Sequence, residues 1–185
     1  MNQNSEVQYP PAEDLGEILF TASEIAERVN ALGNQISQDF AGETPLLVGV
    51  LKGSAIFIAD LMRAILGPVE VDFLAVSSYG EATKSSGVVK ILKDLDQDIS
   101  GRSVILVEDI IDSGLTMRFL VEHLQAQRPA RLATCSLLVR ESAQVNGVSL
   151  DYVGFTIPPS FVIGYGLDVA QRYRNLPYIG TYKNA

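Results

Sequence analysis

The sequence predicts an α/β protein with an open, mainly parallel twisted sheet flanked by helices. Short apolar runs of strand length alternate along the chain with segments whose apolar residues recur at helical spacing. A strand–helix–strand unit spans positions 46–73, which is typical of a parallel sheet. Two of the predicted strands end in glycine-bearing turns, "LKGS" and "DSGLT", and a helical pattern follows each turn.

The size and charge of the chain limit what it can do. Its 185 residues fit a single domain, residues 1–185, and a composition of 47% hydrophobic residues allows a sizeable core. The formal net charge of −8 argues against non-specific binding of nucleic acid, which requires a basic surface. An acidic protein can still bind phosphate groups locally or through a metal ion.

We expect a soluble, cytoplasmic protein. The N-terminal segment lacks the basic start and apolar stretch of a signal peptide, and no apolar run approaches the length of a membrane span. Cys135, the one cysteine, lies in the apolar run "LATCSLLV" and is interpreted as a small core residue. His123, the one histidine, is interpreted as a helix or surface residue without a catalytic role.

The first predicted helix follows a loose polar tail, residues 1 to about 14. Thr21 and Glu24 form a capping box, so the helix is expected to begin there, and Gly42 is its expected end. A single apolar face has residues three and four apart: Ile25, Val29, Leu32, Ile36 and Phe40.

A buried strand, a helix and a second strand follow. "PLLVGVLKG" predicts a strand over 46–51, and "SAIFIADLMRAILG" predicts a helix with Ser54 as its cap and Gly67-Pro68 as its end. "VEVDFLAVSSYG" predicts the next strand, because Val69, Val71 and Phe73 alternate with acidic residues. The small, polar residues 80–87 are expected to form a mobile loop.

The second half continues the alternation. Residues 88–101 are expected to form a strand or a hairpin, and residues 103–108 a strand. A helix follows, with Met117, Leu120, Val121 and Leu124 on one face, and then two buried strands, "RLATCSLLV" and "DYVGFTI". The segment 158–185 breaks the alternation, and with residues 15–22 it is expected to form a small hood.

The turn after strand 103–108 has the composition of an anion site. Ligands in open α/β sheets bind beyond the carboxyl ends of the strands. Ser113, Gly114 and Thr116 would place hydroxyls and backbone N–H groups there, at the N-terminus of a helix. Gly114 can adopt a backbone conformation that other residues avoid.

Three carboxylates precede or enter the same turn. A carboxylate would repel a phosphate, so Glu108 and Asp109 are expected to face sugar hydroxyls or Mg²⁺. Asp112 lies nearer the turn and could take up a proton. Phosphate and hydroxyls joined in one ligand indicate a sugar phosphate. The alternative is an acidic strand end followed by a helix cap at Ser113.

The segment "VILVEDIIDSGLT" resembles the phosphoribosyl-pyrophosphate signature of the type I phosphoribosyltransferases, in which an apolar strand leads to two acids, two apolar residues and Asp-Ser/Thr-Gly-x-Thr. Further segments resemble the hypoxanthine-guanine branch of that family: "LVGVLKGS", "SSYG", "DYVGFTIPPSFVIGYGLD" and "RYRNLPYIG". Together these segments extend over about residues 15–183. The resemblance implies the type I phosphoribosyltransferase fold and a Mg²⁺-dependent enzyme that transfers 5-phosphoribose from phosphoribosyl pyrophosphate to hypoxanthine and guanine.

The resemblance also implies roles around the phosphoribosyl group. Glu108 and Asp109 would hold the ribose hydroxyls, directly or through Mg²⁺, and Asp112 would be the general base or acid at the purine imidazole nitrogen. The 5′-phosphate would be bound mainly by backbone N–H groups of Ser113, Gly114, Leu115 and Thr116. The pyrophosphate would be bound by Leu51, Lys52, Gly53 and Arg174, while Ser78 and Tyr79 would belong to a lid.

Four residues are implied at the purine. Phe161 would stack on the ring, the Val162 backbone would read its edge, and Asp168 would help to hold a second Mg²⁺. The family usually has a lysine that bonds the 6-oxo group, but this chain has Arg140, a longer and forked donor. This departure leaves open the preference among hypoxanthine, guanine and xanthine.

Each of these assignments has a plain structural alternative. Lys52 could be an exposed turn lysine, Phe161 an ordinary core residue, and Arg174 a surface charge on a helix. The loop "SSYGEATKSSG" could be a simple linker.

Two rival functions remain. One is a nucleotide-sensing regulator on the same fold, which would need a basic face that 14 basic against 22 acidic residues do not favour. The other is a phosphoribosyltransferase for adenine or a pyrimidine, against which Arg140 and "FVIGYGLD" argue. The resemblance suggests a homodimer or homotetramer, with no nucleic-acid or membrane partner.

Overall fold

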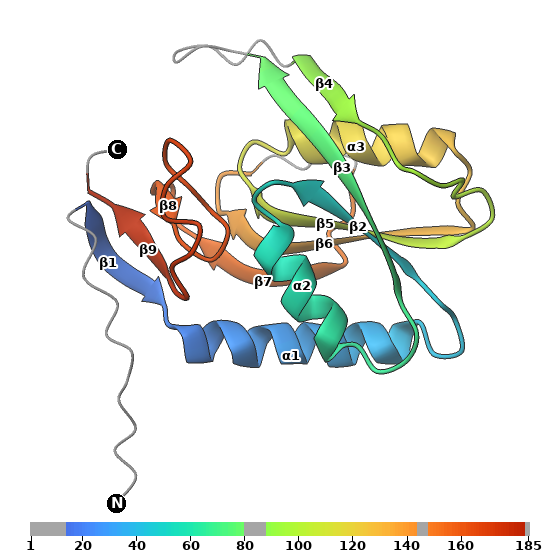
Figure 1. The fold of residues 1–185 in the computed structure, drawn as a ribbon, viewed down its shortest axis with the longest axis horizontal. Coiled ribbons are helices and arrows are strands. Elements are labelled where there is room, and N and C mark those ends of the chain that lie inside the picture. The colour runs from blue at the N-terminus through green and yellow to red at the C-terminus, as the bar shows by residue number, and fades with distance from the viewer. Residues whose placement is uncertain (1–13, 80–87, 144–147, 184–185) are drawn as a thin grey trace, which may run out of the picture.

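A six-stranded sheet forms the centre of the computed structural model, which describes residues 14–79, 88–143 and 148–183 (Figure 1). The strand order is β4-β3-β2-β5-β6-β7. The strands are β2 (Leu46–Leu51), β3 (Glu70–Tyr79), β4 (Val88–Lys93), β5 (Ser103–Ile111), β6 (Arg131–Arg140) and β7 (Tyr152–Ile157). Every neighbouring pair is parallel except β3 and β4, which form an antiparallel hairpin. The predicted open, mainly parallel sheet is confirmed.

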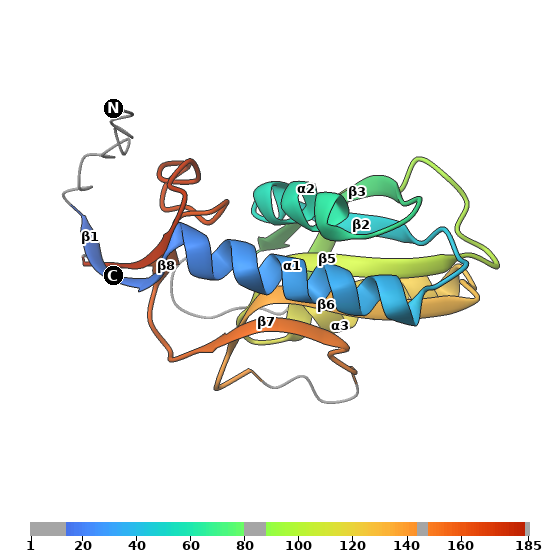
Figure 2. The same cartoon turned by 90° about the horizontal axis from the view of Figure 1, so that it is seen from below.

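Helices cover both faces of this sheet. The helices α1 (Ala22–Asp39) and α2 (Ala55–Ala64) pack on one face, and α3 (Leu115–Ala126) packs on the other (Figure 2). Successive residues of β5 alternate between the two cores, with Ile105 and Val107 facing α1 and α2, and Val104 and Leu106 facing α3. Burial on both faces explains why the parallel strands read as continuous apolar runs.

The sequence predicts a capping residue at the start of α1 and of α2, and the side chain forms the cap only in α1. The capping box of α1 is present, because Thr21 accepts from the Glu24 N–H and the Glu24 side chain accepts from the Thr21 N–H. Ser54 is the N-cap residue of α2, as predicted, but its side chain makes no cap hydrogen bond: its hydroxyl donates instead to the Val50 carbonyl at 2.6 Å. Ser54 already has helical dihedral angles, which direct its side chain back along the chain.

Strand β5 is longer than predicted. It continues to Ile111, so Asp109 lies in the strand and not after it, because Ile110 and Ile111 still pair with Leu138 and Val139 of β6. The four apolar residues predicted for the α3 face are all buried. Cys135 is also buried, as predicted.

A second, smaller sheet joins the two ends of the described chain. Strands β1 (Leu15–Phe20), β9 (Ile179–Tyr182) and β8 (Val162–Ile163) pair antiparallel in the order β1-β9-β8 at one end of the molecule (Figure 1). We call this sheet and the connected segment 158–178 the hood. Residues 1–13 of the predicted tail and the predicted loop 80–87 lie outside the described residues. No helix of the described chain is long and apolar enough to cross a membrane.

Gly33 marks the closest approach of α1 to α2. A Cβ at this position would lie 2.6 Å from the Cβ of Ala64 and from its carbonyl oxygen. We expect Gly33→Ala to lower the free energy of unfolding by about 1–3 kcal/mol, because the two helices must move apart. Urea denaturation would measure the change, with Asn34→Ala on the exposed side of α1 as the control. A Gly33→Ala variant as stable as the wild type would contradict this packing.

Candidate functional site

The carboxyl ends of β2, β5 and β6 meet at the edge of the sheet nearest the hood (Figure 1). Parallel pairing brings these ends together, since Gly49 is paired with Val107, and Glu108 with Ser136. The segment after β2, the acids of β5 and the last residue of β6 therefore surround one space. This is the position at which open α/β sheets bind ligands.

Asp109 lies directly against the turn that follows β2. A Cβ on Gly53 would overlap the Asp109 carboxylate, so only glycine allows the turn to come this close. The preceding Leu51–Lys52 peptide bond is cis. The predicted pyrophosphate turn is therefore in contact with Asp109, one of the two predicted ribose acids.

Both acids of the strand are held in a poorly solvated place. Burial raises the pKa of Glu108 well above its usual value, and the charge of Asp109 raises it further. Burial also raises the pKa of Asp109, to about 6, although backbone N–H groups and Arg174 act in the opposite direction. Asp168 contributes to the increase through its own negative charge. The edge thus concentrates carboxylates that a cation or hydroxyl donors would stabilise.

The turn before α3 is open to an anion. Gly114 is the N-cap residue of α3; it has a left-handed backbone, with φ at 79°, and no side chain with which to cap the helix. The nearest substitute is a long contact of 3.4 Å from the Leu115 N–H to the Ser113 hydroxyl. A cavity of about 80 Å³ lies here, lined by Glu108, Ile110, Ile111, Asp112, Ser113, Gly114, Thr116 and Met117. Free N–H groups at a helix N-terminus favour a phosphate in such a cavity.

A second cavity, of about 240 Å³, contains the residues predicted at the purine. It is lined by Asp109, Ile110, Asp112, Arg140, Phe161, Val162, Leu167 and Asp168. Phe161 is 42% exposed, which argues against an ordinary core role, and its ring lies 5.8 Å from that of Tyr182. Asp112 lines both this cavity and the one at α3. It therefore stands between a phosphate-sized space and a space with an aromatic wall.

Arg140 connects two walls of the larger cavity. Its Nη1 donates to the Ser160 carbonyl at 2.8 Å, next to Phe161. Its Nε lies 2.8 Å from Asp112 Oδ1, an ion-pair distance, but makes no hydrogen bond of good geometry to any described residue. Arg140 is 13% exposed and Asp112 is 70% exposed, so water reaches the pair from the carboxylate side. A poorly directed Nε–H leaves a buried donor available to a ligand.

Lys52 and Arg174, the two predicted pyrophosphate cations, approach one another through Gln171. The Gln171 side-chain oxygen accepts from Lys52 Nζ at 3.2 Å and from Arg174 Nη2 at 3.4 Å. Arg174 also pairs with Asp168 at 2.6 Å. Gln171 was not among the predicted residues. Its only signal in the sequence is its position, three residues from both Asp168 and Arg174.

Two features of the prediction are not brought together. The side chains of Ser78 and Tyr79 lie outside the described residues, although their backbones end β3 beside β4. Within the described ranges, no three acidic, histidine or cysteine side chains are grouped as a ready metal site. His123 lies away from this edge, 3.0 Å from Asp94, which agrees with its predicted non-catalytic position.

We expect Asp109→Asn to stabilise the fold at pH 8. The folded-state pKa of about 6 exceeds the usual 3.8, so the folded state binds the proton more tightly and stability falls as the pH rises from about 4 to about 6. Asparagine removes this penalty, with a gain of roughly 1–3 kcal/mol at pH 8 that shrinks toward pH 4. Urea denaturation across this pH range would measure it.

The control is Asp98→Asn, an exposed carboxylate at the opposite end of β5. It should give no comparable gain at pH 8. A destabilised Asp109→Asn variant at pH 8 would mean that the carboxylate is better solvated or better paired than its surroundings indicate.

Comparisons with known proteins agree with this geometry. Residues 17–170 match the family described as "Phosphoribosyl transferase domain". The hypoxanthine-guanine phosphoribosyltransferase of Mycobacterium tuberculosis is 50% identical over 174 residues, 91% of this chain and 86% of that one. The Bacillus subtilis enzyme of the same name is 46% identical, over 93% and 96%. A hypoxanthine phosphoribosyltransferase structure from Staphylococcus aureus has a TM-score of 0.87 at 42% identity, covering 92% of each chain. The chain therefore belongs to the phosphoribosyltransferase family.

Proposed function

We propose that this protein transfers 5-phosphoribose from phosphoribosyl pyrophosphate to hypoxanthine or guanine, forming the nucleotide and pyrophosphate. The observation that carries the proposal is the position of Asp112 between the two cavities. A nucleotide has its phosphate and its base at opposite ends of the ribose, so one carboxylate between these spaces can reach the base. The names of the relatives support the same reaction.

The proposed reaction depends on charge stabilisation. Departure of pyrophosphate leaves a cationic sugar and a highly charged leaving group. Lys52 and Arg174 would stabilise the leaving group, with Gln171 giving up its contacts to both. The buried carboxylates Glu108 and Asp109 would hold the ribose hydroxyls, and their charge suits a sugar that becomes positive. The backbone N–H groups at the start of α3 would hold the 5′-phosphate.

Asp112 would move the proton. The purine attacks through one imidazole nitrogen, and the carboxylate would serve as base or acid at the ring. Phe161 would stack on the purine, the Val162 backbone would contact its edge, and Arg140 would donate to the 6-oxo group. The residues Ser78 and Tyr79 are proposed to belong to a lid that keeps water from the activated sugar.

The donor set suits Mg²⁺. Asp109 and Asp168 line the same cavity, and Mg²⁺ sites that bind phosphates combine one or two carboxylates with substrate oxygens and water. Glu108 lines the neighbouring cavity and would act with Asp109. When bound, Mg²⁺ would neutralise charge on pyrophosphate and favour its departure. A cytoplasmic location and a homodimer or homotetramer remain predictions from the resemblance.

The regulator alternative gains no support, since the relatives named above carry the names of enzymes. A phosphoribosyltransferase for adenine is also disfavoured. Arg140 is a permanent donor with no acceptor, so it suits a 6-oxo group and would be left unpaired by a 6-amino group.

The direct test is product formation. We expect IMP or GMP when the purified protein is incubated with phosphoribosyl pyrophosphate, Mg²⁺ and the corresponding base. Asp112→Asn should reduce kcat by roughly 10²–10⁴-fold while calorimetry shows normal binding of phosphoribosyl pyrophosphate. Asp98→Asn is the matched control. Folded wild-type protein that makes no nucleotide from any 6-oxopurine would refute the function, and a fully active Asp112→Asn would refute the proton-transfer role.

Arg140→Lys tests whether the forked side chain is needed. Arg140 places two different nitrogens at Asp112 and at the Ser160 carbonyl, whereas lysine is shorter and has one nitrogen to place. We expect the KM for hypoxanthine and for guanine to rise about tenfold, and the KM for phosphoribosyl pyrophosphate to stay within about twofold. Steady-state kinetics with each purine would measure this. Wild-type KM values for both purines would mean that one donor to the 6-oxo group is sufficient.

A further inference from the structure

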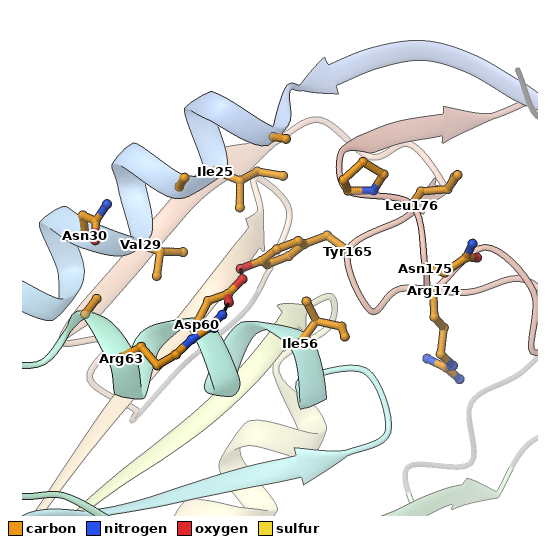
Figure 3. A pocket seen from close by; sticks show the side chains of 14 residues that line it. Ile25, Val29, Asn30, Ile56, Asp60, Arg63, Tyr165, Arg174, Asn175 and Leu176 are labelled. Carbon is orange, nitrogen blue, oxygen red and sulfur yellow. Dashed lines mark hydrogen bonds and ion pairs between the residues drawn. The ribbon is translucent and has the colours of Figure 1, made fainter. Parts of the chain in front are cut away.

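The Tyr165 side chain points away from the proposed active site and toward α2 (Figure 3). It lies between Gly164 and Gly166 with φ at 49°, a backbone conformation that disfavours a bulky residue. Its side chain is 6% exposed, and its hydroxyl donates to Asp60 Oδ2 of α2 at 2.6 Å. Figure 3 shows this side chain reaching from the hood to α2, where Asp60 also pairs with Arg63. An unfavourable backbone held by a part-buried hydrogen bond indicates a specific role.

This hydrogen bond completes a closed set of contacts that links Tyr165, Asp60, the turn at Gly53, and Gly166. A Cβ on Gly166 would overlap the carbonyl oxygen of Gly53, so the two backbones touch. Helix α2 begins at Ala55, two residues after Gly53, and Asp60 lies in its second turn. Gly166 touches the turn at Gly53 from which α2 starts. Tyr165, the neighbour of Gly166, is bonded to the same helix at Asp60.

The same set of contacts also holds Arg174 in place. The Gly166 carbonyl accepts from Arg174 Nη1 at 2.6 Å, and the Gly166 N–H donates to the Arg174 carbonyl at 2.9 Å. The Tyr165 N–H donates to the Leu176 carbonyl at 2.8 Å. Any shift of Tyr165 would move both the guanidinium of Arg174 and the wall of the Lys52–Gly53 turn.

A cavity beside Tyr165 and Asp60 leaves room for Tyr165 to shift. It measures about 500 Å³ and lies between α1, α2 and the hood segment 174–177 (Figure 3). Tyr165 and Asp60 are part of its lining, together with the apolar side chains of Ile25, Val29 and Ile56. Tyr165 is therefore not closely packed on the side that faces the cavity. Its hydrogen bond to Asp60 restrains it there instead.

We propose that Asp60 and Tyr165 are positioning residues for the pyrophosphate half of the active site. Their hydrogen bond holds the Lys52–Gly53 turn and Arg174 at the separation that one pyrophosphate group can bridge. The inference rests on the proposed function for its substrate, but the contacts that carry it are independent of the purine cavity. Neither residue touches the reacting atoms, and both act through Gly166.

The chain provides a matched control. Tyr152 of β7 donates to Asp39 Oδ2 of α1 at 2.8 Å and is 3% exposed, so it makes the same kind of bond. Burial raises the pKa of both tyrosines, so each is a neutral donor near pH 7. Tyr152 is not part of the proposed site. Removal of either hydroxyl should cost similar stability, but only one should change the binding of pyrophosphate.

The experiment compares Tyr165→Phe with Tyr152→Phe. We expect both to lose similar stability in urea denaturation. Only Tyr165→Phe should raise the KM for phosphoribosyl pyrophosphate and the Kd for pyrophosphate, each about tenfold, while the KM for hypoxanthine stays within about twofold. Asp60→Ala should reproduce these changes, and Asp60→Asn should largely restore wild-type values, because its amide oxygen still accepts from the phenol.

Two outcomes would overturn the inference. If Tyr165→Phe keeps wild-type values for both pyrophosphate ligands, the bond only stabilises the fold. If Tyr152→Phe weakens their binding equally, the effect is a general loosening. Calorimetric binding of pyrophosphate is measured without any purine or turnover. Absence of nucleotide formation by the wild type would therefore refute the proposed function, while the positioning role would still be decided by the pyrophosphate Kd values.

Discussion

The parallel pairing of β5 between β2 and β6 determines where the sheet residues of the proposed site lie. It brings three strand ends to one edge, and with them Gly53, Asp109 and Arg140. The same pairing buries Glu108 and half-buries Asp109 where water is scarce, which raises the pKa of both. A carboxylate whose pKa is raised by burial is expected to cost stability near neutral pH, and this cost is intelligible if the acids hold a ligand that becomes positive.

Much of the fold could be predicted because the relevant signals are local. The continuous apolar runs indicate strands buried on both faces, and the capping box predicts the start of α1. The apolar face of Met117, Leu120, Val121 and Leu124 predicts α3. The acids of β5 and the glycine turn before α3 were also visible, since one continuous segment contains them all. At Ser54 the position of the cap was predictable but its bonding was not, because the hydroxyl donates backward to the Val50 carbonyl.

The remaining features depend on contacts between distant parts of the chain. Nothing near Tyr165 in the sequence indicates Asp60, 105 residues away, and nothing near Gln171 indicates Lys52. The extension of β5 through Asp109 follows from pairing with β6 and not from its own residues. The Asp112 contact to Arg140 likewise joins the ends of two strands. The proposed role of the hood in positioning Arg174 and the Lys52–Gly53 turn therefore depends on contacts that only the folded chain makes.

Residues 108–116 are proposed to bind the whole phosphoribosyl group, with the acids at the ribose and the start of α3 at the 5′-phosphate. A crystal structure with phosphoribosyl pyrophosphate and Mg²⁺ would decide this. We expect the 5′-phosphate within hydrogen-bonding distance of the backbone N–H groups of Ser113–Thr116, and the ribose hydroxyls beside Glu108 and Asp109. A 5′-phosphate bound at Lys52 and Arg174, with the turn before α3 empty, would contradict it.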